Sequence, residues 1–158
     1  NIRECKILAG MLQPVETFYP EIADIWVEDM RYPEIAELTC MSLFQHLPYA
    51  SEKAFEWMAD DREYFQLCGF MLMARLLMNG NQLTERSEAE FLDQAMATLQ
   101  SEGVLTRKAA ATALKKFAVQ SKENGKKANR LLAPLTKSDK VELASLAGEI
   151  KLETEYWH

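Results

Sequence analysis

Basic side chains are concentrated in one stretch of the sequence, and their type and spacing suit a polyanion. Residues 104–140 carry ten lysines and arginines against only two acidic residues, a local charge of +8 in a chain whose net charge is −6. Lys108, Lys115 and Lys122 recur every seven residues, which predicts a row along one face of a helix. Such a row suits the phosphates of a nucleic acid, although an ordinary solvated helix face carries lysines too.

The residues expected to contact the polyanion share a positive charge and a place on one of two predicted helices. They are Arg107, Lys108, Lys115, Lys116, Lys122, Lys126, Lys127 and Arg130. Apolar residues at helical spacing between Leu105 and Phe117 predict that the first of these helices is buried on its other side. We therefore expect duplex DNA as a partner, bound mostly through one face.

Charge is divided unevenly along the chain. Residues 1–100 carry seven basic and seventeen acidic side chains, a net charge of −10, whereas residues 101–158 carry eleven basic and seven acidic, a net charge of +4. The acidic part repels phosphate and argues against indiscriminate nucleic-acid binding. It leaves open a protein partner that binds the acidic first two-thirds, and hence a protein-interaction scaffold with no nucleic-acid role.

The elements that position these residues are all expected to be helices. Six glycines and five prolines are few for a fold of many tight turns, and Leu, Ala, Glu, Lys and Met favour helix. Ser51 is the expected N-cap of the fourth helix, and Ser138 or Asp139 that of the last. Helices are predicted at 2–12, 15–29, 34–47, 52–59, 62–78, 88–101, 104–122 and 126–133, and from the cap near 139 to 150.

A weak internal repeat indicates how these helices are arranged. WVEDMR at 26–31 and WMADDR at 57–62 lie 31 residues apart, and each is followed by an apolar helix. Helical hairpins repeating at this period predict an all-α HEAT-like solenoid, here a single domain over 1–158. An irregular helical bundle is the alternative.

The basic stretch also resembles a known family. The segment TRKAAATALKKFAVQSKENGKKA resembles the AlkD-like DNA alkylation repair family, whose pattern R-K-A-x-x-x-A-L-R-x-[YF] runs here from Arg107 to Phe117. The resemblance extends more faintly over the preceding helices. It implies a HEAT-like repeat DNA glycosylase fold that removes positively charged alkylated purines by hydrolysing the N-glycosidic bond, without a metal or redox cofactor.

The resemblance also implies where catalytic residues would lie. Lys115 stands where catalytic members carry an arginine, and it lacks the planar fork of that side chain. Those members also carry a tryptophan and an aspartate spaced W-x-x-x-D. Trp57 and Asp61 have this spacing, whereas Glu37 lies on the helix that aligns with the catalytic one. Glu37, Asp61 and Lys115 are thus the catalytic candidates, and we expect base excision to be weak or absent.

Other sequence features limit the cellular location, the metal content and the membrane association that we expect. Cys5, Cys40 and Cys68 lie far apart among apolar residues, which predicts buried, reduced thiols and a cytoplasmic location. With two histidines in the chain, we expect no metal site. No apolar run is long enough to span a membrane, and we expect no signal peptide. The chain opens with Asn1 and not Met, which leaves open a preceding N-terminal segment that completes a site.

Overall fold

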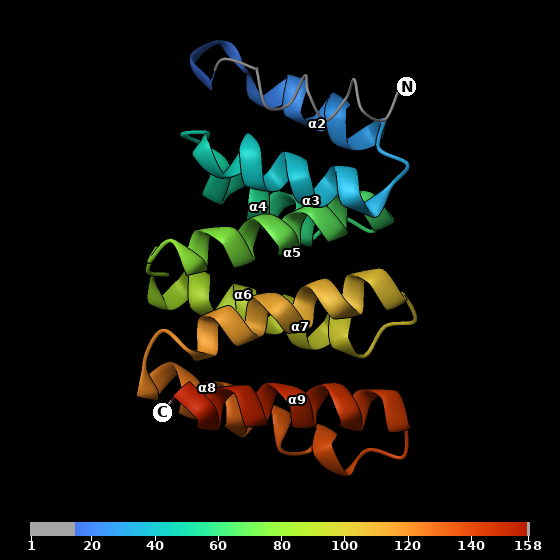
Figure 1. The fold of residues 1–158 in the computed structure, drawn as a ribbon, viewed down its shortest axis with the longest axis vertical. Helices are drawn as coiled ribbons and strands as arrows, with labels where there is room; N and C mark the ends of the chain where they lie inside the picture. The colour runs from blue at the N-terminus through green and yellow to red at the C-terminus, as the bar shows by residue number, and fades with distance from the viewer. Residues whose placement is uncertain (1–14, 158) are drawn as a thin grey trace. The chain divides into compact units, whose positions relative to one another are not determined.

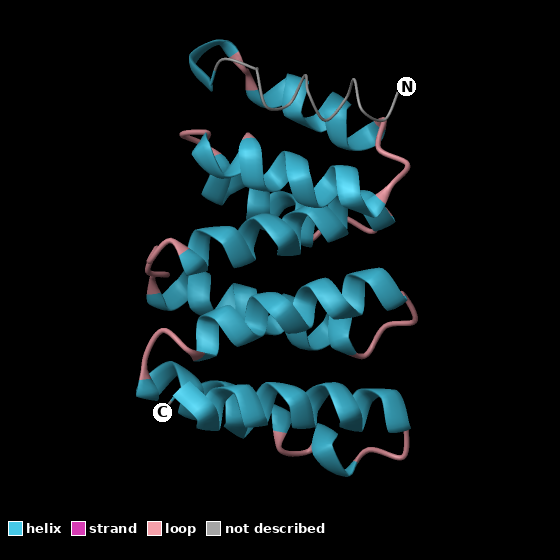
Figure 2. Ribbon diagram, viewed as in Figure 1, coloured by secondary structure: helices cyan, strands magenta, loops and turns pink. Residues whose placement is uncertain are grey.

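The computed structural model describes residues 15–157, and every regular element in that range is a helix (Figure 2). The elements follow one another (Figure 1) as η1 (Val15–Thr17), α2 (Pro20–Glu28), α3 (Pro33–Ser42), η2 (Phe44–His46), α4 (Ala50–Met58), α5 (Glu63–Met78), α6 (Glu85–Leu99), α7 (Val104–Ala118), α8 (Lys122–Leu132), η3 (Leu135–Lys137) and α9 (Val141–Trp157). The prediction of an all-α chain is confirmed for these residues. The helix predicted at 2–12 lies outside them.

The chain divides into two compact units, residues 1–76 and 77–158. Helices α2 to α4 and nearly all of α5 belong to the first unit, and α6 to α9 belong to the second. The predicted single domain of HEAT-like repeats stays a prediction.

Proline sets the start of two helices in the first unit. Pro20 and Pro33 occupy the first turn of α2 and α3, where the missing N–H group would have had no helical partner. The predicted cap of α4 is wrong. That helix begins at Ala50, so Ser51 lies inside its first turn, and no side chain caps it.

Four buried aromatic rings form the centre of the first unit. Phe44 lies with its ring centroid 6.3 Å from that of Phe18 and 5.2 Å from that of Trp57, and Trp57 lies 6.4 Å from Phe65. Trp57 is only 1% exposed. Rings at these separations gain about 0.5–1.5 kcal/mol per pair beyond the area that they bury, so this row joins the residue after η1 to η2, α4 and α5.

A buried lysine joins α4 to α2. The Lys53 Nζ atom donates to both carboxylate oxygens of Asp24, at 2.9 and 3.0 Å, and lies 3.2 Å from Glu56. The Trp57 Nε1 atom donates to the same Asp24 carboxylate at 2.8 Å. Burial lowers the pKa of Lys53, but the hydrogen bonds to Asp24 and Glu56 outweigh it and raise that pKa overall. The stabilisation is therefore present at neutral pH and is lost as pH rises through the raised pKa.

A close helix approach in the first unit occurs at Gly69, in the middle of α5. A Cβ atom at this position would lie 2.4 Å from the backbone nitrogen of Met58 and 2.9 Å from the carbonyl carbon of Trp57. Glycine is therefore required here because α5 crosses the last turn of α4 in backbone contact.

Two free thiols lie in the core beside this crossing. Cys40 and Cys68 are both buried, which confirms the prediction for these two residues, and Cys5 lies outside the described residues. The Cys40 Sγ atom donates to the Cys68 carbonyl oxygen at 3.7 Å, and the Cys68 Sγ atom lies 3.5 Å from the sulfur of Met30. The hydrogen bond with Cys40 and burial raise the pKa of Cys68 well above its ordinary value.

The second unit is organised around α7. This helix packs against α6, α8 and α9, and Figure 1 shows α7 in front of α6 and α9 in front of α8. The ring of Phe117 on α7 lies 5.7 Å from that of Phe91 on α6. The last helix continues to Trp157, beyond the predicted end at Ile150, and Thr154 in this extension is buried, with its hydroxyl donating to the Ile150 carbonyl.

Candidate nucleic-acid interface

Helix α7 is buried around most of its circumference, so only a narrow strip of it is open to a ligand. Ala109, Ala110 and Ala113 are buried, and their small side chains allow the neighbouring helices to approach closely. Lys108 and Thr112 are exposed on the remaining strip. The amphipathic pattern predicted the buried side correctly, but of the lysines expected on the other side only Lys108 is exposed, while Lys115 and Lys116 are partly buried.

Two of the predicted DNA-contacting residues of α7 are paired with glutamates of α9. The Arg107 Nη2 atom lies 3.1 Å from Glu142, and the Lys115 Nζ atom lies 3.8 Å from Glu149. The Arg107 side chain is only 15% exposed. Glu142 and Glu149 are seven residues apart and lie on one face of α9, as Arg107 and Lys115 do on α7. Their positive charge is therefore largely balanced within the protein.

The predicted row of Lys108, Lys115 and Lys122 is wrong, because α7 ends at Ala118 and Lys122 begins α8. The side-chain hydroxyl of Ser121 accepts a hydrogen bond from the Asn124 N–H at 3.1 Å and caps the new helix.

The predicted break at 123–125, between helices at 104–122 and 126–133, is wrong. Gly125 is a buried residue inside α8, which runs over 122–132 and not 126–133. A glycine is tolerated in a helix interior, at a cost of about 1 kcal/mol relative to alanine.

Three cations on α8 form the most open basic surface of the second unit, here called the α8 basic strip. Lys122, Lys126 and Arg130 are four residues apart, lie on one face of the helix and are all exposed. None of the three forms an ion pair or a side-chain hydrogen bond within the described part of the chain. They remain available to an anion from outside the chain.

The neighbouring lysine of α8 is turned toward α6. The Lys127 Nζ atom donates to both carboxylate oxygens of Glu88, at 3.0 and 3.2 Å, and lies 3.7 Å from Glu123. The hydrogen bond to Glu88 raises the pKa of Lys127. Lys127 therefore contributes to the packing of α8 against α6 more than to an external surface.

The basic residues of α7 and α8 do not share one face, so this prediction is also wrong. Lys108 lies on the side of α7 opposite to Ala110 and Leu114, which are buried. The α8 basic strip lies opposite to Gly125 and Ala128, which face the rest of the second unit. Figure 1 shows α7 in front of α6 and α8 behind α9, so the exposed sides of α7 and α8 lie on different layers of the second unit.

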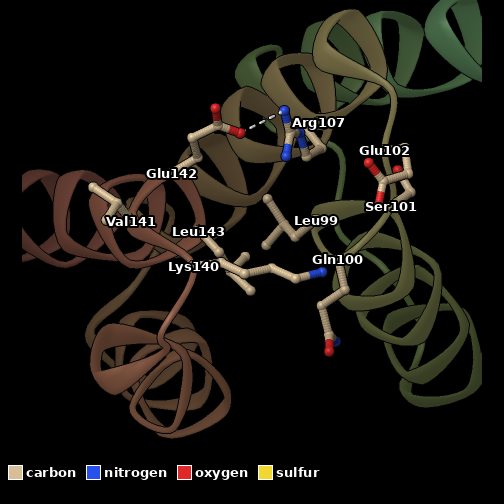
Figure 3. Close-up of a pocket in the computed structure, with 9 residues that line it drawn as sticks. All are labelled: Leu99, Gln100, Ser101, Glu102, Arg107, Lys140, Val141, Glu142 and Leu143. Atoms are coloured by element: carbon tan, nitrogen blue, oxygen red, sulfur yellow. Dashed lines mark ion pairs between the residues drawn. The ribbon is translucent and has the colours of Figure 1, made fainter.

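A cavity of about 300 Å³ lies beside the ion pair of Arg107 and Glu142 (Figure 3). Glu102 and Lys140 also line it, and the Lys140 side chain extends toward Gln100. Two acidic and two basic side chains leave its lining without net charge. This cavity is thus a poor candidate for an anion site.

The catalytic candidates of the first unit do not form a site suited to the chemistry. Trp57 is buried and hydrogen-bonded to Asp24, whereas Asp61 is exposed, so this pair cannot hold a base and a carboxylate together. Glu37 is exposed on α3. An exposed carboxylate is screened by water and stabilises a developing cation only weakly.

Asp60, the neighbour of Asp61, is already engaged by an arginine. Its carboxylate accepts from Arg62 Nε at 3.0 Å and from Arg62 Nη2 at 2.9 Å, and these bonds lower the pKa of Asp60. The Arg62 guanidinium also lies 3.7 Å from the centre of the Phe65 ring. This arrangement holds the turn between α4 and α5.

Lys151 was missed by the sequence prediction, and Lys137 was counted in the basic stretch but not named as a contact. Both line a second cavity of the second unit together with Arg130. Lys151 lies in α9, outside the basic stretch, and no local pattern marks it. Its proximity to Arg130 follows only from the packing of α8 against α9.

Two further findings concern the described residues alone. None of their helices is both long and apolar enough to cross a membrane. No group of three or more histidine, cysteine, aspartate or glutamate side chains among them is placed to hold a metal ion.

A comparison of the chain with known protein families, with curated proteins and with solved structures finds no significant match. The function must therefore be inferred from the side chains themselves.

Proposed function

We propose that the chain is a DNA-binding helical-repeat protein with a HEAT-like arrangement, related to alkylpurine DNA glycosylases and with weak or absent base excision. The observation that carries DNA binding is the α8 basic strip, whose three cations have no partner within the described chain. Uncompensated, exposed cations in a row are the usual means of contacting a phosphate backbone.

The dimensions of the strip agree with this proposal. Lys122 and Arg130 are eight residues apart, which corresponds to about 12 Å along the helix. Duplex DNA carries one charge per about 1.7 Å of its axis, so a strip of this length faces several phosphates. The acidic first unit would be repelled by the duplex and would limit how the protein lies on it.

The test of DNA binding is its dependence on salt. With three phosphate contacts, the logarithm of the association constant should fall by about 2.7 for each tenfold rise in salt, which is about 40-fold between 50 and 200 mM. Fluorescence anisotropy of a labelled duplex measures this slope. No binding at about 50 mM salt would contradict the proposal.

We expect little or no release of methylated purines above the rate without protein. A glycosylase must stabilise a cationic sugar as the base leaves, and a fixed carboxylate near the sugar supplies several kcal/mol. Glu37 and Asp61 are both exposed to water. The measurement is a time course of released base from alkylated duplex DNA, beside a Glu37→Gln variant. Rapid release that this variant loses would identify Glu37 as catalytic and contradict the expectation.

One observation favours the alternative of a protein-interaction scaffold. Tyr19, Ile25 and Tyr32 are 50–61% exposed on the acidic first unit. Large apolar side chains on a surface of this kind are frequent at protein interfaces. The salt titration separates the two functions, because a scaffold without a nucleic-acid role would not bind the duplex.

A further inference from the structure

A second cavity of the second unit combines size with an unbalanced positive charge. It encloses about 480 Å³ between the end of α8, η3 and α9. Arg130, Lys137 and Lys151 all line it, and no acidic side chain of the described residues does. Three positive charges around one hollow repel one another, so the arrangement favours an anion that lies among them.

The three cations come from three different elements. Arg130 lies on α8, Lys137 ends η3, and Lys151 lies in α9. All three are exposed at the rim, and none forms an ion pair within the described residues. Their convergence therefore arises from the tertiary fold and does not follow from one run of lysines.

One residue that lines the cavity carries an unsatisfied polar atom, and this atom is itself closed to solvent. Asn129 lines the cavity, and its Oδ1 atom is buried without a hydrogen-bond partner. A buried acceptor without a donor is unfavourable. A ligand that brings an N–H or O–H group beside its anion allows the Asn129 amide to turn and be paired. A nucleotide has this combination, with a phosphate at one end and donors on its base.

Arg130 connects this cavity to the α8 basic strip, since it belongs to both. A DNA strand that follows Lys122 and Lys126 therefore reaches the cavity at Arg130. A terminal phosphate monoester carries a charge of about −1.5 to −2 at neutral pH, whereas an internal diester carries one negative charge. Three converging cations favour the terminal group.

We propose that this cavity, called the end-phosphate site, binds a phosphate monoester, and that the monoester is the terminal phosphate of a DNA strand. This inference rests on the proposed function, because the α8 basic strip brings the strand to the site. A free phosphorylated nucleotide has the same chemistry and is the other possible source of the ligand.

The experiment compares two DNA hairpins that differ in one group. Each has a single open end, with either a 5′-phosphate or a 5′-hydroxyl, and fluorescence anisotropy measures binding to the full chain. We expect the phosphorylated hairpin to bind about tenfold more tightly. The double variant Lys137→Ala, Lys151→Ala should bind both hairpins alike. Arg86→Ala removes an exposed cation of α6 outside both sites, and it should keep the preference.

Competition with a 5′-mononucleotide and with inorganic phosphate identifies the source of the monoester. Weak competition by both compounds supports the strand end as the source. Displacement of the phosphorylated hairpin by the mononucleotide at the same concentration as the hairpin would overturn that assignment in favour of a free nucleotide.

The remaining outcomes separate this inference from the proposed function. Equal binding of both hairpins by the unmodified chain would overturn the end-phosphate site while leaving DNA binding intact. A third outcome is that neither hairpin binds, that the nucleotide binds the unmodified chain, and that the double variant does not bind the nucleotide. This would support the monoester site and contradict the proposed function. Binding of neither would overturn both.

Discussion

Replacing Gly69 with alanine is expected to destabilise the first unit by about 2–3 kcal/mol, although alanine is the better helix former. The added methyl group would lie 2.4 Å from the Met58 backbone nitrogen and 2.9 Å from the Trp57 carbonyl carbon. Backbone atoms cannot rotate away, so α4 and α5 must separate and the aromatic row beside them must loosen. Urea denaturation followed by tryptophan fluorescence measures the loss.

Gly148 provides the matched control. It lies inside α9, and a Cβ atom there would meet nothing within 4 Å. Gly148→Ala should therefore stabilise the second unit by about 0.5–1 kcal/mol through helix propensity alone. Because both substitutions gain the same propensity, opposite signs isolate the packing at Gly69. A Gly69→Ala chain as stable as the unmodified one would show that α4 and α5 lie farther apart.

Removing the α8 basic strip should abolish most DNA binding. The triple variant Lys122→Ala, Lys126→Ala, Arg130→Ala loses three phosphate contacts, so its affinity should fall by more than about 100-fold at 50 mM salt. The salt dependence should flatten by about one unit per cation removed. Anisotropy with the same duplex gives both quantities, and circular dichroism checks that the helices remain.

The matched control removes three cations from α7. Lys108→Ala, Lys115→Ala, Lys116→Ala should weaken binding by less than about tenfold, because Lys115 already has Glu149 at 3.8 Å and α7 faces another direction. The opposite ranking of the two triple variants would place the interface on α7. It would then agree with the position implied by the resemblance to alkylation repair proteins.

The helices of this chain could be predicted from local pattern, but several of their ends could not. Apolar spacing correctly predicted the end of α5 at Met78. The end of α7 depends on distant contacts instead. The Gln120 amide donates to the carbonyl oxygens of Leu77 and Asn81, at 2.9 and 3.0 Å. A pattern of neighbouring residues in the sequence cannot reveal a hydrogen bond between residues about forty positions apart.

The positive charge of the candidate site could be predicted from the sequence, but the positions and partners of its side chains could not. The sequence predicted the basic stretch and each cation in it, because counting needs no structure. It did not show that Arg107 and Lys127 face Glu142 and Glu88, since these partners lie on other helices. Nor did it show that Lys151 approaches Arg130. Which cations are balanced within the chain is decided mainly by tertiary packing.

The two buried thiols allow the opening of the first unit to be measured by chemical labelling. A thiol reacts with alkylating reagents as its thiolate, and the raised pKa and burial of Cys68 suppress that form in the folded chain. Cys40 is equally enclosed, and residues 77–158 contain no cysteine. In a Cys5→Ser background, the rate of labelling therefore follows the opening of the first unit, whatever the second unit does. The labelling rate thus reports local unfolding of the first unit, and the second unit contributes no signal.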